Sequence, residues 1–155
     1  MKTVYVLIAL VALVFAMPVE GAVRGKGAKY VGGTVTGMPE NAEGQLDLAR
    51  DDAAVFTAKS GQTVSIMYKN VESLEYGQKA GRRVGVALAV SPLFLFSKKR
   101  KHFLSISFSD EQGRKQGAVF ELAKGAVRDT LTTFETRSGK KIEYESEEAR
   151  KHAGN

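Results

Sequence analysis

The sequence predicts an α+β protein that is mostly β, a strongly bent antiparallel barrel or sandwich of about seven strands with one C-terminal amphipathic helix. Three observations predict it. Short stretches with period-two apolar alternation recur at close spacing, a Gly-containing turn joins the last two, and a stripe with helical spacing follows directly. The chain of 155 residues is long enough for one domain.

The first half of the domain is predicted to hold a series of short strands. The stretch 30–36 is apolar and β-branched around Gly32 and Gly33, which predicts a first strand with a kink or bulge. Turn-forming residues separate the stretches that follow it. The later strands are expected at 45–48, 54–58, 63–68 and 71–76.

The second half is expected to begin with a hairpin. In the stretch 103–109, Leu104, Ile106 and Phe108 point to one face, and we expect that face to be buried. The segment 110–114 (DEQGR) is rich in turn formers, and the stretch 116–122 alternates again. Two such strands with a short Gly-containing link predict a hairpin.

A helix and a charged end follow the hairpin. The residues Ala123, Val127, Leu131 and Phe134 are spaced at four, four and three positions, which gives one apolar helix stripe. The pair Ser138-Gly139 is a helix stop signal, because glycine accepts the left-handed conformation that ends helices. The stretch 140–144 can add a few extended residues, and 145–155 is predicted to be a mobile or frayed tail.

The start of the chain has the layout of a secretory signal peptide. A basic start precedes an apolar run at 4–16, Pro18 ends the run, and small residues follow at Gly21 and Ala22. We therefore expect export to the periplasm, the cell envelope or the extracellular space, with cleavage after Gly21 or after Ala16. The alternative is an uncleaved anchor, although the run is short of the ~20 residues that a spanning helix needs.

Composition narrows the chemistry further. The chain has no cysteine, which excludes a disulfide framework and a thiolate metal site. Its formal net charge of +6 would attract an exported protein to anionic lipid head groups or acidic polymers.

The predicted organisation is a signal peptide at 1–21, a linker at 22–29, the domain at 30–144 and a charged tail at 145–155.

One strongly apolar segment, 84–96 (VGVALAVSPLFLF), stands between basic residues. We favour a buried connection that packs on the barrel, since apolar segments of small domains usually belong to the core. The alternative is a loop that dips into a membrane while its cations meet anionic head groups. The candidate membrane or partner contacts are Arg82, Arg83, Leu93, Phe94, Phe96, Lys98, Lys99, Arg100 and Lys101.

The sequence offers no set of residues typical of catalysis. His102 and His152 are its only histidines, and His102 begins a strand without an evident nucleophile or orienting carboxylate. The acidic pairs at 51–52 and 110–111 lie in predicted turns, which explain them. We therefore expect no enzyme activity, no cofactor, no metal and no nucleic-acid partner.

Three segments carry a resemblance to the pleckstrin-homology-like superfold, especially its small bacterial and GRAM-like members. They are 64–75 (VSIMYKNVESLE), 103–108 and 119–122, the last leading into the helix. The resemblance covers about 30–138 and implies a strongly bent barrel with the helix plugging one open end. It also implies binding or scaffolding, because members of this superfold bind lipids, peptides or proteins.

The chain departs from the phosphoinositide-binding members in one loop. In those members the loop between the first two strands is basic, whereas here it carries Glu40 and Glu43 and no Lys or Arg. We therefore do not expect inositol phosphates at the usual site. The expected function is an exported, non-catalytic module that engages a protein or peptide partner; the alternative is a peripheral membrane-binding module that uses 84–96 and its basic flanks.

Overall fold

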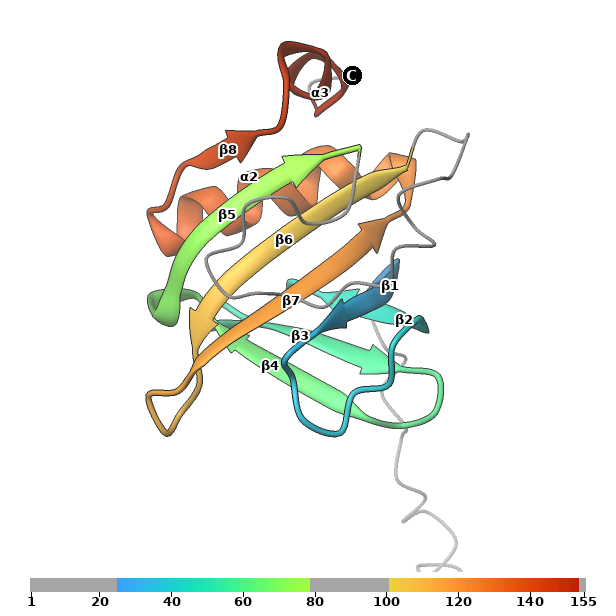
Figure 1. The fold of residues 1–155 in the computed structure, drawn as a ribbon, viewed down its shortest axis with the longest axis vertical. Helices are drawn as coiled ribbons and strands as arrows, with labels where there is room; N and C mark the ends of the chain where they lie inside the picture. The colour runs from blue at the N-terminus through green and yellow to red at the C-terminus, as the bar shows by residue number, and fades with distance from the viewer. Residues whose placement is uncertain (1–24, 79–100, 154–155) are drawn as a thin grey trace, which may run out of the picture.

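The computed structural model describes residues 25–78 and 101–153. In this part of the chain one curled sheet is accompanied by two α-helices and two short 3-10 helices (Figure 1). The strands are β1 (Lys26–Gly33), β2 (Ala42–Asp47), β3 (Ala53–Ala58), β4 (Thr63–Met67), β5 (Val71–Gly77), β6 (His102–Ser109), β7 (Lys115–Leu122) and β8 (Ile142–Tyr144). The helical segments are η2 (Tyr68–Asn70), η4 (Lys124–Ala126), α2 (Val127–Ser138) and α3 (Glu147–Ala153).

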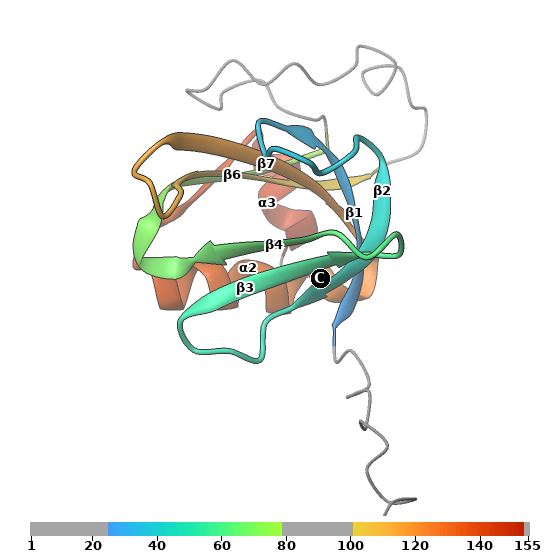
Figure 2. The same cartoon turned by 90° about the horizontal axis from the view of Figure 1, so that it is seen from below.

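The sheet consists of two antiparallel meanders joined side by side, with β8 added in parallel to β5 at one edge. Its strand order is β4-β3-β2-β1-β7-β6-β5-β8, and the pairing of β1 with β7 connects the meander β1–β4 to the meander β5–β7. Figure 2 shows that the sheet curls, so that β3 and β4 lie opposite β6 and β7. The predicted α+β, mostly β class is confirmed, and the sheet has eight strands where about seven were predicted.

The predicted bulge in the first strand is also confirmed. The pairing of β1 with β7 shifts register between Tyr30 and Gly32. Gly33 follows with a φ of 153°. A Cβ atom on Gly33 would lie 2.1 Å from the carbonyl oxygen of Gly117, so the two strands approach more closely there than any side chain permits.

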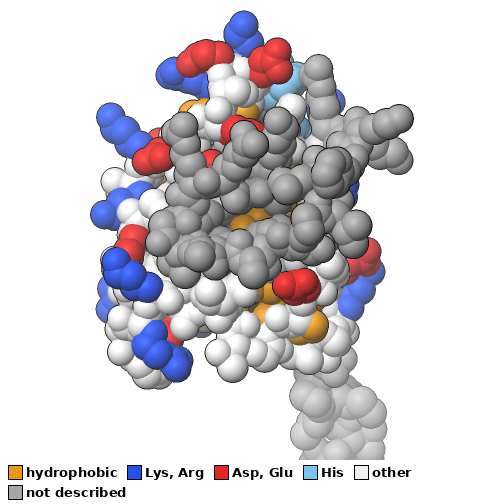
Figure 3. Space-filling view, viewed as in Figure 1, with side chains coloured by type: hydrophobic (Ala, Val, Ile, Leu, Met, Phe, Trp, Pro, Cys, Tyr) orange, Lys and Arg blue, Asp and Glu red, His pale blue; other side chains and the backbone are white. Residues whose placement is uncertain are grey.

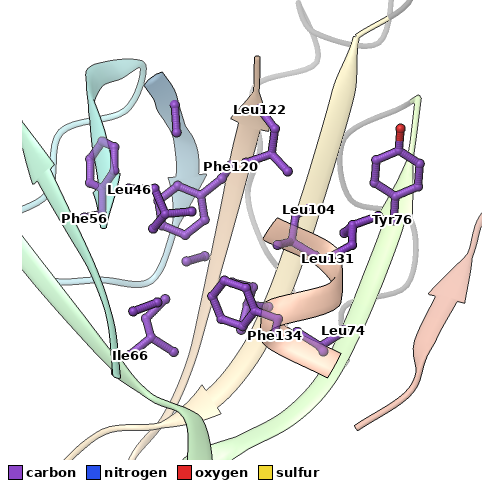
Figure 4. Close-up of a cluster of buried hydrophobic side chains, with 14 of the residues drawn as sticks. Leu46, Phe56, Ile66, Leu74, Tyr76, Leu104, Phe120, Leu122, Leu131 and Phe134 are labelled. Carbon is purple, nitrogen blue, oxygen red and sulfur yellow. The ribbon is translucent and has the colours of Figure 1, made fainter. Parts of the chain in front are cut away.

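The concave side of the sheet encloses the core (Figure 4). The expected buried face of β6, with Leu104, Ile106 and Phe108, is confirmed. The opposite face of β6 is buried as well, although the alternation predicted only one buried face: Phe103, Ser105 and Ser107 are at most 5% exposed. The strand therefore has the burial pattern of a central strand, with Ser105 and Ser107 beside Phe103 on its second face.

Helix α2 packs its apolar stripe into this core. Val127, Leu131 and Phe134 are buried with the inward side chains of the strands, and the Phe134 ring meets that of Tyr68 edge-on. The helix begins at Val127 after the 3-10 turn η4, four residues later than the stripe alone indicated. It ends as predicted, because Gly139 adopts the left-handed conformation and its N–H donates to the Glu135 carbonyl.

Arg137, in the last turn of α2, fixes the helix to the connection between β2 and β3. Its Nη1 donates to the carbonyl oxygens of Leu48 and Arg50, and its Nη2 donates to Asp51 Oδ1 at 3.1 Å. The guanidinium also lies over the Tyr68 ring, 5.5 Å from its centroid. These contacts join the helix to the far side of the curled sheet.

Folded elements extend beyond both ends of the predicted domain, 30–144. β1 begins at Lys26, inside the expected linker 22–29, and Ala28 is buried because β1 pairs with β2 on one side and β7 on the other. The expected tail 145–155 contains α3, whose Ala149 and Ala153 are buried. The Ser146 hydroxyl accepts a hydrogen bond from the Ala149 N–H and caps this helix. The predicted signal peptide and the apolar segment 84–96 lie outside the described residues.

Candidate binding groove beside strand β4

A groove of about 290 Å³ lies between β4 and the turn that joins β6 to β7. One side is β4, the last strand of the first meander, and the other side is the 110–114 turn with the start of β7. Val35 and Thr36, from the connection between β1 and β2, also line it. The groove therefore lies at the seam where the curled sheet does not close on itself.

The backbone of β4 has one side free for hydrogen bonding. In the part of the chain that the structure describes, β4 pairs with β3 alone. The Ala58 N–H donates to the Gln62 carbonyl, and the Tyr68 N–H donates to the Asp52 carbonyl, so residues 58 and 62 and residues 52 and 68 are hydrogen-bonded pairs of this antiparallel ladder. Hydrogen-bonded and non-hydrogen-bonded pairs alternate along such a ladder, and these bonds fix its phase, that is, which pairs are bonded. Val64 and Ile66 therefore direct their backbone groups to β3.

The remaining β4 residues therefore direct their backbone groups away from the sheet. These residues are Thr63, Ser65 and Met67, and all three line the groove. The groove thus exposes a row of peptide N–H and C=O groups at the spacing of every second residue in a strand. The floor beneath this row is apolar, with Val64 and Phe108 largely buried and Val35 partly buried against the core.

The opposite wall is held rigidly by Asp110. Its Oδ1 accepts hydrogen bonds from the N–H groups of Gln112 and Arg114, and its Oδ2 accepts from Arg114 Nε and Gln116 Nε2. Desolvation raises the pKa of Asp110, but these hydrogen bonds outweigh it and hold the pKa below its usual value. The turn role predicted for this acidic residue is confirmed.

The wall is also tied to the β1–β2 connection. Thr34 Oγ1 donates to Gln116 Oε1 at 2.7 Å and accepts from the Gly117 N–H at 2.9 Å. The backbone N–H of Thr34 donates to the Gly117 carbonyl. The start of β7 and the β1–β2 connection are therefore joined by side-chain and main-chain hydrogen bonds.

The structure describes one of the sequence-predicted contact residues. Lys101 directly precedes β6, and its Nζ donates to Glu121 Oε2 at 2.9 Å. It lies away from the groove and next to a carboxylate. The other candidates, Arg82, Arg83, Leu93, Phe94, Phe96, Lys98, Lys99 and Arg100, lie outside the described residues.

His102 is engaged in a contact between strands. Tyr76 Oη lies 2.6 Å from His102 Nδ1, and the two rings stack with centroids 6.2 Å apart. Burial lowers the pKa of His102, and His152 and Lys124 lower it further. Burial, and then Tyr144, raises the pKa of Tyr76 to about 12. The histidine thus belongs to an aromatic cluster at the end of β5 and β6.

Charges on the described surface are mixed. Lys and Arg side chains are interspersed with Asp and Glu on the face that Figure 3 shows. Ion pairs such as Lys59–Glu43, Lys115–Glu72 and Lys26–Asp129 neutralise cations locally. Within residues 25–78 and 101–153, no cluster of His, Asp or Glu could hold a metal ion, and no helix has the length and apolar character needed to cross a bilayer.

The groove was not predicted from the sequence. The stretch TVSIM of β4 indicates a strand, but whether it is an inner or an end strand depends on the order of strands in the sheet. No protein-family model matches this chain, and a comparison with curated proteins finds no match either. The chemistry that the groove offers is therefore the basis for assigning a function.

Proposed function

We propose that the protein is an exported, non-catalytic binding or scaffolding module of pleckstrin-homology-like fold, which engages a protein or peptide partner in the cell envelope. The observation that carries the proposal is the groove between β4 and the β6–β7 turn. It combines free backbone hydrogen-bonding groups with an apolar floor and a wall fixed by Asp110. This combination suits a polypeptide better than a small charged metabolite.

The order of elements supports the fold part of the proposal. Two antiparallel meanders curl around one core, and a helix follows the last strand of the second meander and packs into that core. This is the arrangement that the resemblance to the pleckstrin-homology-like superfold implies. The eighth strand and α3 are additions that the resemblance does not predict.

Peptide panning tests the proposal. The full chain, immobilised, is panned against a displayed library of random peptides, and the binding of selected peptides is measured with two matched variants. Thr36→Trp fills the groove, because Thr36 is exposed and lines it. Thr132→Trp places the same side chain on the exposed face of α2, outside the groove.

We expect Thr36→Trp to lower the affinity for the selected peptides by about tenfold or more and Thr132→Trp to leave this affinity nearly unchanged. Failure to enrich any peptide, or equal binding by both variants, would overturn the proposal.

Sedimentation with anionic vesicles, run in parallel, tests the membrane hypothesis for 84–96. Binding to vesicles that is lost when Lys98, Lys99 and Arg100 are changed to Glu would favour that hypothesis instead.

A further inference from the structure

We propose that the groove binds a single extended peptide segment as an added strand on β4, with apolar side chains at alternate positions of the peptide. The inference rests on the proposed function and specifies how the partner is recognised. Its basis is the phase of the β3–β4 ladder, which directs the backbone groups of Thr63, Ser65 and Met67 into the groove. An extended chain beside β4 would satisfy these groups with its own.

The free edge of β4 lacks the features that usually protect an end strand. Natural sheets protect exposed edges with charged side chains, proline or bulges, because a bare edge pairs with other chains. The residues of β4 are Thr, Val, Ser, Ile and Met, and its pairing with β3 is regular over the whole strand. Because this edge is unprotected and lies inside a groove, it is suited to pairing with an added strand.

The floor of the groove specifies the side chains of the peptide. Side chains of an added strand alternate between the two faces of the sheet. Those on the inner face would continue the row formed by Val64 and Ile66 and would meet Phe108 and Val35. Those on the outer face would lie beside Thr63 and Ser65, which are exposed. Apolar residues are therefore expected at every second peptide position.

The wall of the groove favours one strand over a second copy of this protein. Gln112 and Arg114 line the groove opposite β4, so a chain inside it has β4 on one side and the β6–β7 turn on the other. A second copy would bring its own β3 beside its β4, and this additional strand would meet the turn. A single peptide segment brings no additional strand that would meet the turn.

Two measurements test strand addition on the full chain. The first uses a peptide selected by panning and methylates its backbone amides one at a time, which removes one hydrogen-bond donor each time while the protein is unchanged. We expect affinity to fall by about tenfold at every second amide and to change little at the amides between them, because only alternate amides face β4.

The second measurement compares Ser65→Pro with Ser65→Ala. Proline removes the Ser65 N–H, which points into the groove and not to β3, so the fold tolerates the change. We expect Ser65→Pro to lower the affinity for the peptide by about tenfold and Ser65→Ala to bind the peptide as tightly as the unaltered chain does. Circular dichroism confirms that Ser65→Pro is folded, and the methylation series stands independently if it is not.

The outcomes separate this inference from the proposed function. If Thr36→Trp weakens the peptide while methylation shows no alternation and Ser65→Pro binds normally, the groove is the site but strand addition is wrong. If no peptide is enriched, the proposed function fails together with the inference. If the full chain forms a dimer that Ser65→Pro dissociates, a second copy occupies the edge and the single-peptide inference is overturned.

Discussion

At the scale of single residues, Gly33 shows how the close approach of two strands restricts the sequence. Its φ of 153° lies where side chains are strained, and the Gly117 carbonyl occupies the space that a Cβ atom would take. The same hypothetical atom would lie 2.8 Å from Tyr30 Oη. The bulge of β1 therefore depends on glycine for both conformation and space.

We expect Gly33→Ala to lower the free energy of unfolding by about 2–3 kcal/mol, because the main chain must shift to relieve the contact. Gly27→Ala is the matched control in the same strand. A Cβ atom there meets nothing within 4 Å, so its effect should stay within about 0.5 kcal/mol. Chemical denaturation measures both values, and equal losses for the two variants would contradict the role assigned to Gly33.

At the scale of elements, β8 and α3 close the far end of the sheet. β8 pairs parallel to β5, the only parallel pairing in the described part of the chain, and α3 buries Ala149 beside it. The Glu145 carboxylate accepts a hydrogen bond from the Gln78 N–H. The C-terminal segment is therefore part of the folded unit and protects the edge of β5.

Replacement of the buried alanine tests this role. We expect Ala149→Gln to destabilise the protein by about 1–3 kcal/mol, because a larger polar side chain must enter a packed site. Arg150→Gln, at the exposed neighbouring position, should cost less than about 0.5 kcal/mol. Hydrogen exchange should also accelerate at the amides of β8 in Ala149→Gln; unchanged protection there would show that α3 does not hold β8.

The sequence predicts elements well where one apolar face packs on a common core. The hairpin of β6 and β7 and the stop of α2 at Gly139 follow from alternation, turn residues and a glycine. The start of β1 could not be predicted, because VRGKGAK has no apolar pattern and its strand depends on two neighbours. The helix α3 could not be predicted either, since it buries only two alanines among charged residues.

The candidate site could not be predicted for a different reason. The edge of β4 becomes available only because the sheet ends there, and sheet order is a property of long-range pairing. The sequence directed attention to the basic flanks of 84–96, where composition is unusual. The groove is instead formed by ordinary residues, such as Ser65, whose backbone groups point away from β3, and Gln112, which lines the opposite side.

At the scale of the whole molecule, His102 makes stability depend on pH. Its pKa in the folded protein lies below the 6.5 of a free histidine. Between these two values the unfolded chain binds a proton that the folded chain does not. The stability contributed by this residue is therefore complete above about pH 6.5 and is lost as the pH falls through the folded pKa.

We expect the melting temperature to drop less between roughly pH 7.5 and pH 5.5 in His102→Phe than in the unaltered chain, because phenylalanine has no proton to take up. An aromatic ring at this position keeps the stack on Tyr76. His152→Gln leaves His102 in place and should keep most of the pH dependence. Identical profiles for His102→Phe and the unaltered chain would exclude a contribution from His102.

The junction between β1 and β7 also has a consequence for the order of folding. Ala28 pairs with Leu122, whereas every other antiparallel pairing joins strands that are consecutive in the described part of the chain. Consecutive strands can pair locally, but the ladder between β1 and β7 must bring together strands that are far apart in the sequence. Its formation therefore carries the largest loop-closure entropy of the strand pairings in the described part of the chain. We expect this ladder to form last in folding, and until it forms the free edge of β1 can pair with another chain. A refolding yield that falls as protein concentration rises would indicate such pairing between chains during folding.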